Sequence, residues 1–275
     1  MISDVHHIGI AVRDLDAALA FYRDALSLPC VKEGEMRARG VRVAMLAAGR
    51  GYLEVIQPVE ASSPFTSFIE ERGEGLHHVA LWSDDIEGDV ATLSRLGVPL
   101  TDAEPREGFT GRLCYLAPEA FDGVQIEVVQ PEAAFAGANP TPGPISRIDH
   151  VVLRAPSPKT VCERMAAWFA VGTKRTFERG ESTFAFMRPG DVVIEVIGPT
   201  QAPAEPRPGN IAGLAFEVTG IDELTADLKA KGYPVGEPHP ALQGGRIVSV
   251  HQSGACGVPV AFIDFAGSPG APSGD

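Results

Sequence analysis

A pattern that recurs four times along the chain constrains its fold more than any other feature. Each quarter of the sequence reads as a strand, an amphipathic helix and two or three further strands. In the first quarter, apolar side chains fall at helical spacing between two apolar strand-like runs, at Leu15, Leu19, Tyr22 and Leu26. A helix between strands at this spacing is typical of a βαβββ unit. We therefore expect an α+β fold built from four βαβββ modules.

The second half of the chain restarts the pattern of the first. The segment RIDHVVLRAP matches the first strand, DVHHIGIAV, and aligns His150 with His7. Likewise VVIEVIGP matches YLEVIQP and aligns Glu195 with Glu54. The chain therefore reads as two copies of a two-module domain.

A stretch rich in Pro, Gly and Ala, without periodicity, separates the two copies and is expected to be a linker. The predicted organisation is a domain at 1–131, a linker at 132–146, a second domain at 147–267 and a disordered tail at 268–275.

Two strands of the first half carry neighbouring histidines, and strand phase separates their roles. Because side chains alternate between the faces of a strand, His6 shares its face with large apolar residues, whereas His7 shares its face with Gly9. The face with small residues leaves room for a metal and a ligand, so His7 is the candidate donor. The same count in LHHVALW selects His78 over His77.

Two glutamates lie inside strand-like runs so apolar that an unpaired carboxylate there would be costly, Glu54 in YLEVIQP and Glu127 in VQIEVVQP. Each candidate taken alone resembles an ordinary polar strand residue, but four in the same structural position indicate a shared metal site. Two imidazoles and two carboxylates fill four positions of an octahedral divalent ion and leave two for substrate. The predicted ligands are His7, Glu54, His78 and Glu127.

The second copy holds only half of this set. Gly213 stands where the second histidine would be, and Ala261 stands where the second glutamate would be. His150 and Glu195 remain, and they form an alternative pair of metal ligands.

Composition excludes several classes of partner. The chain has 275 residues, 44% of them hydrophobic, and a net charge of −13, which disfavours nucleic acid and anionic membranes because both are bound through basic surface. No stretch approaches the ~20 apolar residues of a membrane span. The amino terminus shows no secretion signal, so we expect a cytoplasmic location.

At these motifs the chain resembles the vicinal oxygen chelate superfamily, in which paired βαβββ modules form a cup around a divalent metal. The first half is most similar to methylmalonyl-CoA epimerases, and the likeness extends through HHIGIAVRDLDAALAFYRDALSL, LEVIQPVEASSPFTSFIEERGEGLHHVAL, EPREGFTGR and GVQIEVVQP. The resemblance implies the same four ligands as strand phase. It implies two vicinal oxygen chelate domains, the second of them degenerate.

What the resemblance implies for function is a metal-dependent epimerase or isomerase that works through an enolate, on methylmalonyl-CoA or a related α-acidic acyl or carbonyl compound. The metal, one divalent ion, would be Co, Ni, Mn, Zn or Fe. A further acidic residue of some epimerases is replaced here by Val43. We therefore expect Glu127 and Glu54 to act as the acid and base as well as ligands.

The loop EPREGFTG ends in a short segment with glycine at both of its ends, Gly108 and Gly111, directly before a strand, so it could close over a substrate. Arg106 or Arg112 would then meet a substrate carboxylate. An ordinary hairpin with solvated arginines is an equally good interpretation.

The sequence is also compatible with other functions known for this fold. A glyoxalase-type lyase acting on a hemithioacetal is the nearest alternative. A ring-cleaving dioxygenase and a non-catalytic, antibiotic-sequestering binding protein are further ones. Modules one and two could pair around the four ligands, with the second half as a covalent pseudo-dimer partner, alone or in a homodimer. Alternatively, modules two and three could pair and bring His150 and Glu195 beside His78 and Glu127.

Overall fold

A computed structural model describes residues 2–137, 139, 141–242 and 244–266. The tail predicted at 268–275 lies outside the described residues, and the domain boundaries at 131 and 147 stay a prediction. The chain divides into two compact units, each built from three separate segments. Unit 1 comprises Met1–Gly9, His77–Ala138 and His150–Ala212, and unit 2 comprises Ile10–Leu76, Asn139–Asp149 and Gly213–Asp275.

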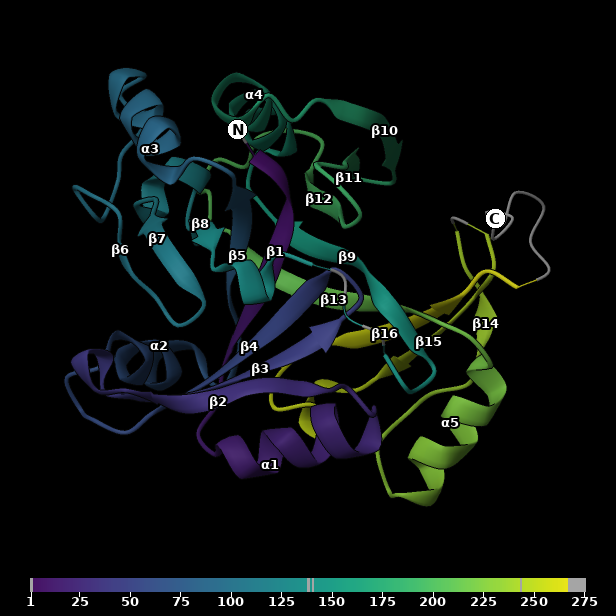
Figure 1. The fold of residues 1–275 in the computed structure, drawn as a ribbon. Helices are drawn as coiled ribbons and strands as arrows, with labels where there is room; N and C mark the ends of the chain where they lie inside the picture. Colours follow the sequence, from purple (N-terminus) through teal and green to yellow (C-terminus); the bar gives the residue numbers. More distant parts are fainter. Residues whose placement is uncertain (1, 138, 140, 243, 267–275) are drawn as a thin grey trace. The chain divides into compact units, whose positions relative to one another are not determined.

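The first of two eight-stranded mixed sheets holds the strands of the first two repeats (Figure 1). Their order in the sheet is β2-β3-β4-β1-β5-β8-β7-β6. The strands are β1 (Ile2–Ala11), β2 (Cys30–Met36), β3 (Val41–Ala48), β4 (Gly51–Pro58), β5 (Gly75–Ser83), β6 (Arg106–Glu107), β7 (Gly111–Tyr115) and β8 (Ile126–Pro131). The neighbours β1 and β5 come from different repeats, so modules one and two share this sheet.

The helix predicted from the first stripe is present in the structure, and the first half contains one helix that no stripe predicts. The helical segments are α1 (Leu15–Leu19), continued by the π-helical η1 (Ala20–Ala25), then α2 (Pro64–Arg72) and α3 (Ile86–Arg95), with single 3-10 turns η2 (Arg37–Arg39), η3 (Pro118–Phe121) and η4 (Ala133–Phe135). Leu15, Leu19, Tyr22 and Leu26 are all buried, as the stripe predicts. No apolar stripe predicts α2, which buries only Phe65 and Ile69.

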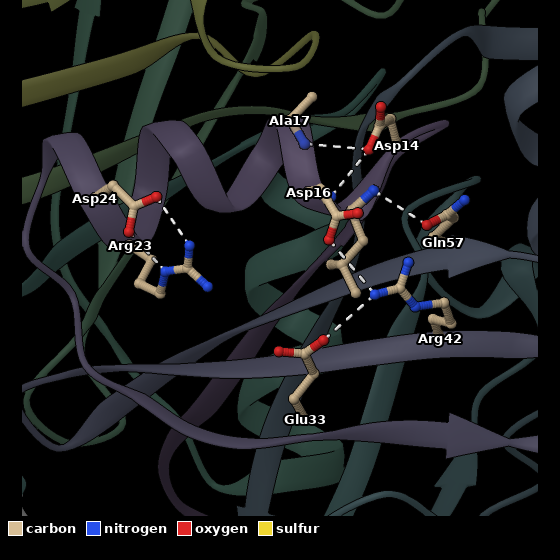
Figure 2. Close-up of polar contacts among 9 residues, drawn as sticks. Asp14, Asp16, Ala17, Arg23, Asp24, Glu33, Arg42 and Gln57 are labelled. Carbon is tan, nitrogen blue, oxygen red and sulfur yellow. Dashed lines mark hydrogen bonds and ion pairs between the residues drawn. The ribbon is translucent and has the colours of Figure 1, made fainter.

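The start of α1 is fixed by polar contacts that Figure 2 shows. Asp14 is the N-cap, and its carboxylate accepts hydrogen bonds from the backbone N–H groups of Asp16 (2.9 Å) and Ala17 (3.1 Å). The side-chain oxygen of Gln57, on β4, accepts from the backbone N–H of Leu15 at 3.1 Å. The helix is thereby attached to the strand that carries Glu54.

The second sheet repeats the architecture with the strands of the last two repeats, in the order β10-β11-β12-β9-β13-β16-β15-β14. The strands are β9 (Ile145–Arg154), β10 (Thr173–Arg179), β11 (Ser182–Met187), β12 (Val193–Pro199), β13 (Asn210–Val218), β14 (His239–Pro240), β15 (Arg246–Val250) and β16 (Val260–Asp264). The helical segments are α4 (Pro158–Phe169), α5 (Ile221–Ala230) and the turn η5 (Gln252–Gly254). The predicted α+β fold of four modules in two sheets is confirmed.

Register in the two sheets is equivalent. In the first sheet, β5 and β8 run parallel with Ala80 opposite Glu127. In the second, β13 and β16 run parallel with Ala215 opposite Ala261. Since Ala80 follows His78 by two residues and Ala215 follows Gly213 by two, the alignment of the two halves holds in space as well as in sequence.

Unit 1 packs the second repeat against the third. The guanidinium of Arg164, on α4, donates to the carbonyl of Ala120 and to the carboxylate of Asp122, both at 2.9 Å. The ring of Phe121 meets Trp168 edge to face, with 5.4 Å between centroids. Both halves of the sequence therefore contribute to the core of this unit.

Unit 2 packs the first repeat against the fourth in the same way. The hydroxyl of Tyr22, a fully buried residue, donates to the carbonyl of Ala255 at 3.0 Å. The ring centroids of Phe21 and Tyr233 lie 5.0 Å apart. Within the described part of the chain, no helix has the length and apolar content needed to cross a membrane.

Candidate metal centre

Three side chains of unit 1 converge from β1, β5 and β8. The Nε2 atoms of His7 and His78 lie 3.1 Å apart. Glu127 completes the group, with Oε1 3.6 Å from His7 Nε2 and Oε2 3.7 Å from His78 Nε2. Their exposures are 2%, 0% and 1%, so this polar cluster is almost wholly removed from solvent.

The carboxylate of Glu127 is the group of the cluster whose burial costs most. Neither of its oxygens has a hydrogen-bond partner, although both are buried. A buried carboxylate without donors is strongly unfavourable, because the water that solvated it has not been replaced. A cation between the two imidazoles and this carboxylate would remove the cost.

Glu54, the fourth predicted ligand, belongs to unit 2. Glu54 lies on β4 opposite Met45 of β3 and is 8% exposed. All four residues that the sequence predicts as ligands are therefore buried, and the three in unit 1 form one cluster.

The spacing of the two imidazoles fits a metal centre. Metal–nitrogen bonds of about 2.1 Å place two adjacent ligand atoms of an octahedral ion about 3.0 Å apart. The distance between the two Nε2 atoms, 3.1 Å, agrees with this. Imidazole and carboxylate donors together suit Zn, Fe, Co, Ni or Mn rather than a soft ion that prefers thiolates.

Gly9 explains why the sequence needs a small residue two positions after His7. A Cβ atom at this position would lie 2.1 Å from Cε1 and 2.2 Å from Nδ1 of the His78 ring. Such contacts are far inside van der Waals distance, so the ring occupies space that a side chain would otherwise fill. The expectation of a face with small residues is confirmed at this residue.

Tyr115 is a residue of the site that sequence reasoning missed. It lies on β7 directly opposite Glu127, so the two side chains share a face of the sheet. Its ring meets the ring of His78 edge to face, with 5.4 Å between centroids. The signal that could have found it is register: Tyr115 is the last residue of the strand paired with the one that carries Glu127.

Asp102 holds Tyr115 and Arg106 together. Its Oδ2 accepts from the backbone N–H of Tyr115, and its Oδ1 accepts from Nε of Arg106, both at 3.0 Å. The guanidinium of Arg106 lies over the Tyr115 ring, 5.5 Å from its centroid. The predicted substrate-binding residue Arg106 is thus connected to the cluster through Tyr115.

Arg112 is engaged elsewhere. Its guanidinium pairs with the carboxylate of Glu87, on α3, and donates to the carbonyl of Pro105 at 2.9 Å. These contacts tie the loop before β7 to a helix. They describe a structural role for Arg112, and its predicted contact with substrate stays a prediction.

Cys114, on β7, is fully buried. Burial raises the pKa of its thiol to about 11, and the carboxylates of Asp102 and Glu127 act in the same direction. The thiolate is the reactive form of cysteine, so at neutral pH this side chain behaves as an apolar core residue. All four cysteines of the chain are free.

The alternative ligand pair lies in the second sheet. His150 Nε2 and Glu195 Oε2 are 3.6 Å apart, and the side chains are 12% and 15% exposed. The strand that carries His150, β9, is flanked by β12 and β13 and not by β5. His150 and His78 therefore belong to different sheets, although their modules both contribute to unit 1, and the alternative ligand set stays a prediction.

Comparison with known proteins places the chain in a family. A model of the glyoxalase/bleomycin resistance protein/dioxygenase superfamily matches residues 6–117. The uncharacterized protein YqjC of Bacillus subtilis is 35% identical over 127 residues, which are 46% of this chain and 91% of the relative. The chain belongs to the glyoxalase/bleomycin resistance protein/dioxygenase superfamily.

Among the relatives in this superfamily is the ethylmalonyl-CoA/methylmalonyl-CoA epimerase of Cereibacter sphaeroides. It is 31% identical over 133 residues, which are 47% of this chain and 99% of that enzyme. Epimerase relatives cover the first half of the chain. A complete epimerase therefore matches only half of this protein.

A solved structure with a similar fold covers nearly the whole chain. A triple mutant of 4-hydroxymandelate synthase from Streptomyces coelicolor superposes with a TM-score of 0.74 over 99% of this chain and 94% of that one. The sequences are 18% identical, so this likeness shows the fold alone. The likeness in fold includes the second half, which the family model does not match.

Proposed function

We propose that the first half of the chain is a metal-dependent epimerase or isomerase that acts through an enolate, on methylmalonyl-CoA or a related α-acidic acyl-CoA. The observation that carries the proposal is the buried carboxylate of Glu127, without donors, beside the Nε2 atoms of His7 and His78. Relatives named as methylmalonyl-CoA epimerases support the choice of reaction.

His7, His78, Glu127 and Glu54 would hold the ion. Lewis-acid stabilisation of negative charge on a carbonyl oxygen is the chemistry that a divalent cation supplies in such a site. Two imidazoles and two carboxylates leave part of an octahedral shell open, which suits a substrate that presents two oxygens.

The protein's own groups must move the proton. Epimerisation requires that a base take the α-proton from one face of the substrate and that an acid return one to the other face. Glu127 and Glu54 come from β8 and β4, and both carboxylates are at least nine-tenths buried. We assign proton transfer to these two residues, since Val43 cannot take part.

Burial of the cluster also matters for the reaction. Because the three side chains in unit 1 are at most 2% exposed, water is excluded from the polar atoms. Electrostatic interactions are stronger in such a medium than in bulk water, and a reactive carbanion is protected from stray protons.

The test begins with elemental analysis of the purified full chain and of a Glu127→Ala variant. An exchange assay in deuterated water then follows the α-proton of methylmalonyl-CoA. We expect about one equivalent of divalent metal in the wild type, little in the variant, and deuterium incorporation only with the wild type. Glu195→Ala is the matched control, because it removes the aligned carboxylate of the second sheet and should change neither result.

Each other outcome redirects the assignment. Metal without exchange would overturn the epimerase reaction and direct the search to hemithioacetals, the substrates of a glyoxalase-type lyase. Absence of metal after reconstitution would overturn the metal site and favour a binding protein. The full chain is used because each compact unit contains segments from both halves.

A further inference from the structure

Four histidines of unit 1 form a continuous row of hydrogen-bonding contacts that ends on a backbone carbonyl. Nδ1 of His77 lies 3.0 Å from Nδ1 of His78, whose Nε2 lies 3.1 Å from Nε2 of His7. Nδ1 of His7 lies 2.8 Å from Nδ1 of His6. The row ends where Nε2 of His6 lies 3.2 Å from the carbonyl oxygen of Phe135.

The carbonyl at the end of the row is held in place. Phe135 closes the single turn η4, in which its N–H donates to the carbonyl of Glu132 at 2.8 Å. Its side chain is 6% exposed, and His6 is fully buried with its ring 5.6 Å from that of Trp82. The first turn after β8 therefore presents a fixed acceptor to the first strand of the chain.

This acceptor determines the direction of the hydrogen bond between His6 and His7. A carbonyl oxygen can only accept, so Nε2 of His6 must carry the proton. A neutral imidazole has one N–H, and a charged one at a fully buried position is costly, so Nδ1 of His6 is an acceptor. Nδ1 of His7 must then be the donor. Nε2 of His7 is left with a lone pair directed at the cluster.

We propose that His6 is a positioning residue that, anchored by the carbonyl of Phe135, fixes His7 in the tautomer that binds metal through Nε2. This inference rests on the metal site of the proposed function. Strand phase alone describes His6 as a core residue, whereas this inference gives it a role in metal binding. Hydrogen bonds to the far nitrogen of a metal-bound imidazole commonly change metal affinity 10–100-fold.

Binding of zinc ion alone to the full chain tests the proposal, with a chromophoric chelator as competitor. His6→Leu keeps the apolar bulk and removes both hydrogen bonds, and we expect it to weaken zinc binding at least tenfold. His6→Asn keeps an acceptor near the position of Nδ1, and we expect it to recover most of the loss. Ile8→Val, at another fully buried position of β1, is the control for packing and should bind zinc as the wild type does.

The outcomes separate this inference from the proposed function. If the wild type binds no zinc, the metal site fails and the effect of His6 on affinity cannot arise. If the wild type binds and His6→Leu binds equally well, or if His6→Asn and His6→Leu lose the same affinity, then His6 only fills space and the inference is overturned.

A second measurement does not depend on any variant folding. Long-range ¹H–¹⁵N correlation spectra of the metal-free wild type should show His6 protonated at Nε2 and His7 at Nδ1. Addition of zinc should leave both tautomers unchanged. Protonation of His7 at Nε2 in the metal-free protein would overturn the inference.

Discussion

The ring of His78 occupies the space that a side chain at Gly9 would fill. A Cβ atom on the glycine would lie 2.1 Å from Cε1 of the imidazole. Gly9 and His78 lie on different strands of unit 1, β1 and β5. The imidazole can keep its position beside His7 only while residue 9 has no side chain.

The first prediction follows from this contact. In a Gly9→Ala variant the His78 ring must move, so we expect zinc affinity to fall more than tenfold while the chain still folds. Zinc affinity and far-UV circular dichroism are the measurements. Gly172→Ala is the matched control, because a Cβ there meets nothing within 4 Å. Unchanged affinity in Gly9→Ala would show that the ring position is not needed for binding.

The second prediction concerns the cost of the buried carboxylate. A Glu127→Gln variant replaces a charge without donors by a neutral amide, so the metal-free protein should become more stable to urea by about 1–3 kcal/mol. The stabilisation by added zinc, about 2.7 kcal/mol at a hundred times the dissociation constant in the wild type, should shrink or vanish. A metal-free variant less stable than the wild type would contradict this account of Glu127.

A third prediction compares the two aligned histidines. His7→Ala should abolish zinc binding, whereas His150→Ala should leave the stoichiometry unchanged. The reason is that Ala261 occupies the register position of Glu127 in the second sheet, so His150 keeps only Glu195 of the equivalent set. Metal analysis of both variants decides, and loss of metal in His150→Ala alone would reverse the assignment.

The fourth prediction tests the support of Tyr115. Asp102→Ala removes the acceptor of two hydrogen bonds, from the Tyr115 backbone and the Arg106 side chain, and should lower the unfolding free energy by about 1–3 kcal/mol. Glu104→Ala changes an exposed acid two residues away and should stay within about 0.5 kcal/mol of the wild type. Equal effects of the two variants in urea unfolding would deny Asp102 this role.

The fifth prediction concerns pH. Burial raises the pKa of Cys114 and of Cys256 from 9.0 to about 11. Below pH 9 both thiols are protonated whether the chain is folded or not, so their contribution to stability is complete. Between about pH 9 and 11 the unfolded chain loses these protons first, and stability should fall.

Alkylation checks the same pKa values independently. At pH 8 a thiol with a pKa of about 11 is about one part in a thousand thiolate, so both cysteines should react with iodoacetamide slowly until the chain unfolds. Labelling in denaturant, where all four cysteines react, provides the reference. Rapid labelling of Cys114 in the native protein would contradict its raised pKa.

The parts of the site that depend on local periodicity could be predicted from the sequence. Alternation along β1 and β5 singled out His7 and His78, because side-chain direction in a strand is fixed by neighbouring residues. The helix stripe through Leu15 and Leu19 follows from the same kind of local rule. These features require no knowledge of which strands pair.

Features that depend on long-range pairing could not be predicted in this way. Tyr115 enters the site through its register with Glu127, and Asp102 enters through a bond to the backbone of Tyr115. The carbonyl of Phe135 lies in the segment expected to be a linker, where sequence offers no periodicity at all. The role proposed for His6 depends on that carbonyl as its hydrogen-bond acceptor.

The division of the chain into interleaved units has a consequence for its covalent continuity. Because Arg164 bonds Asp122 within unit 1 and Tyr22 bonds Ala255 within unit 2, each pair of partners lies on opposite sides of the segment 132–146. A protease that cuts there would sever one peptide bond and none of these contacts. The two fragments should therefore elute together from a size-exclusion column, as the subunits of a heterodimer do.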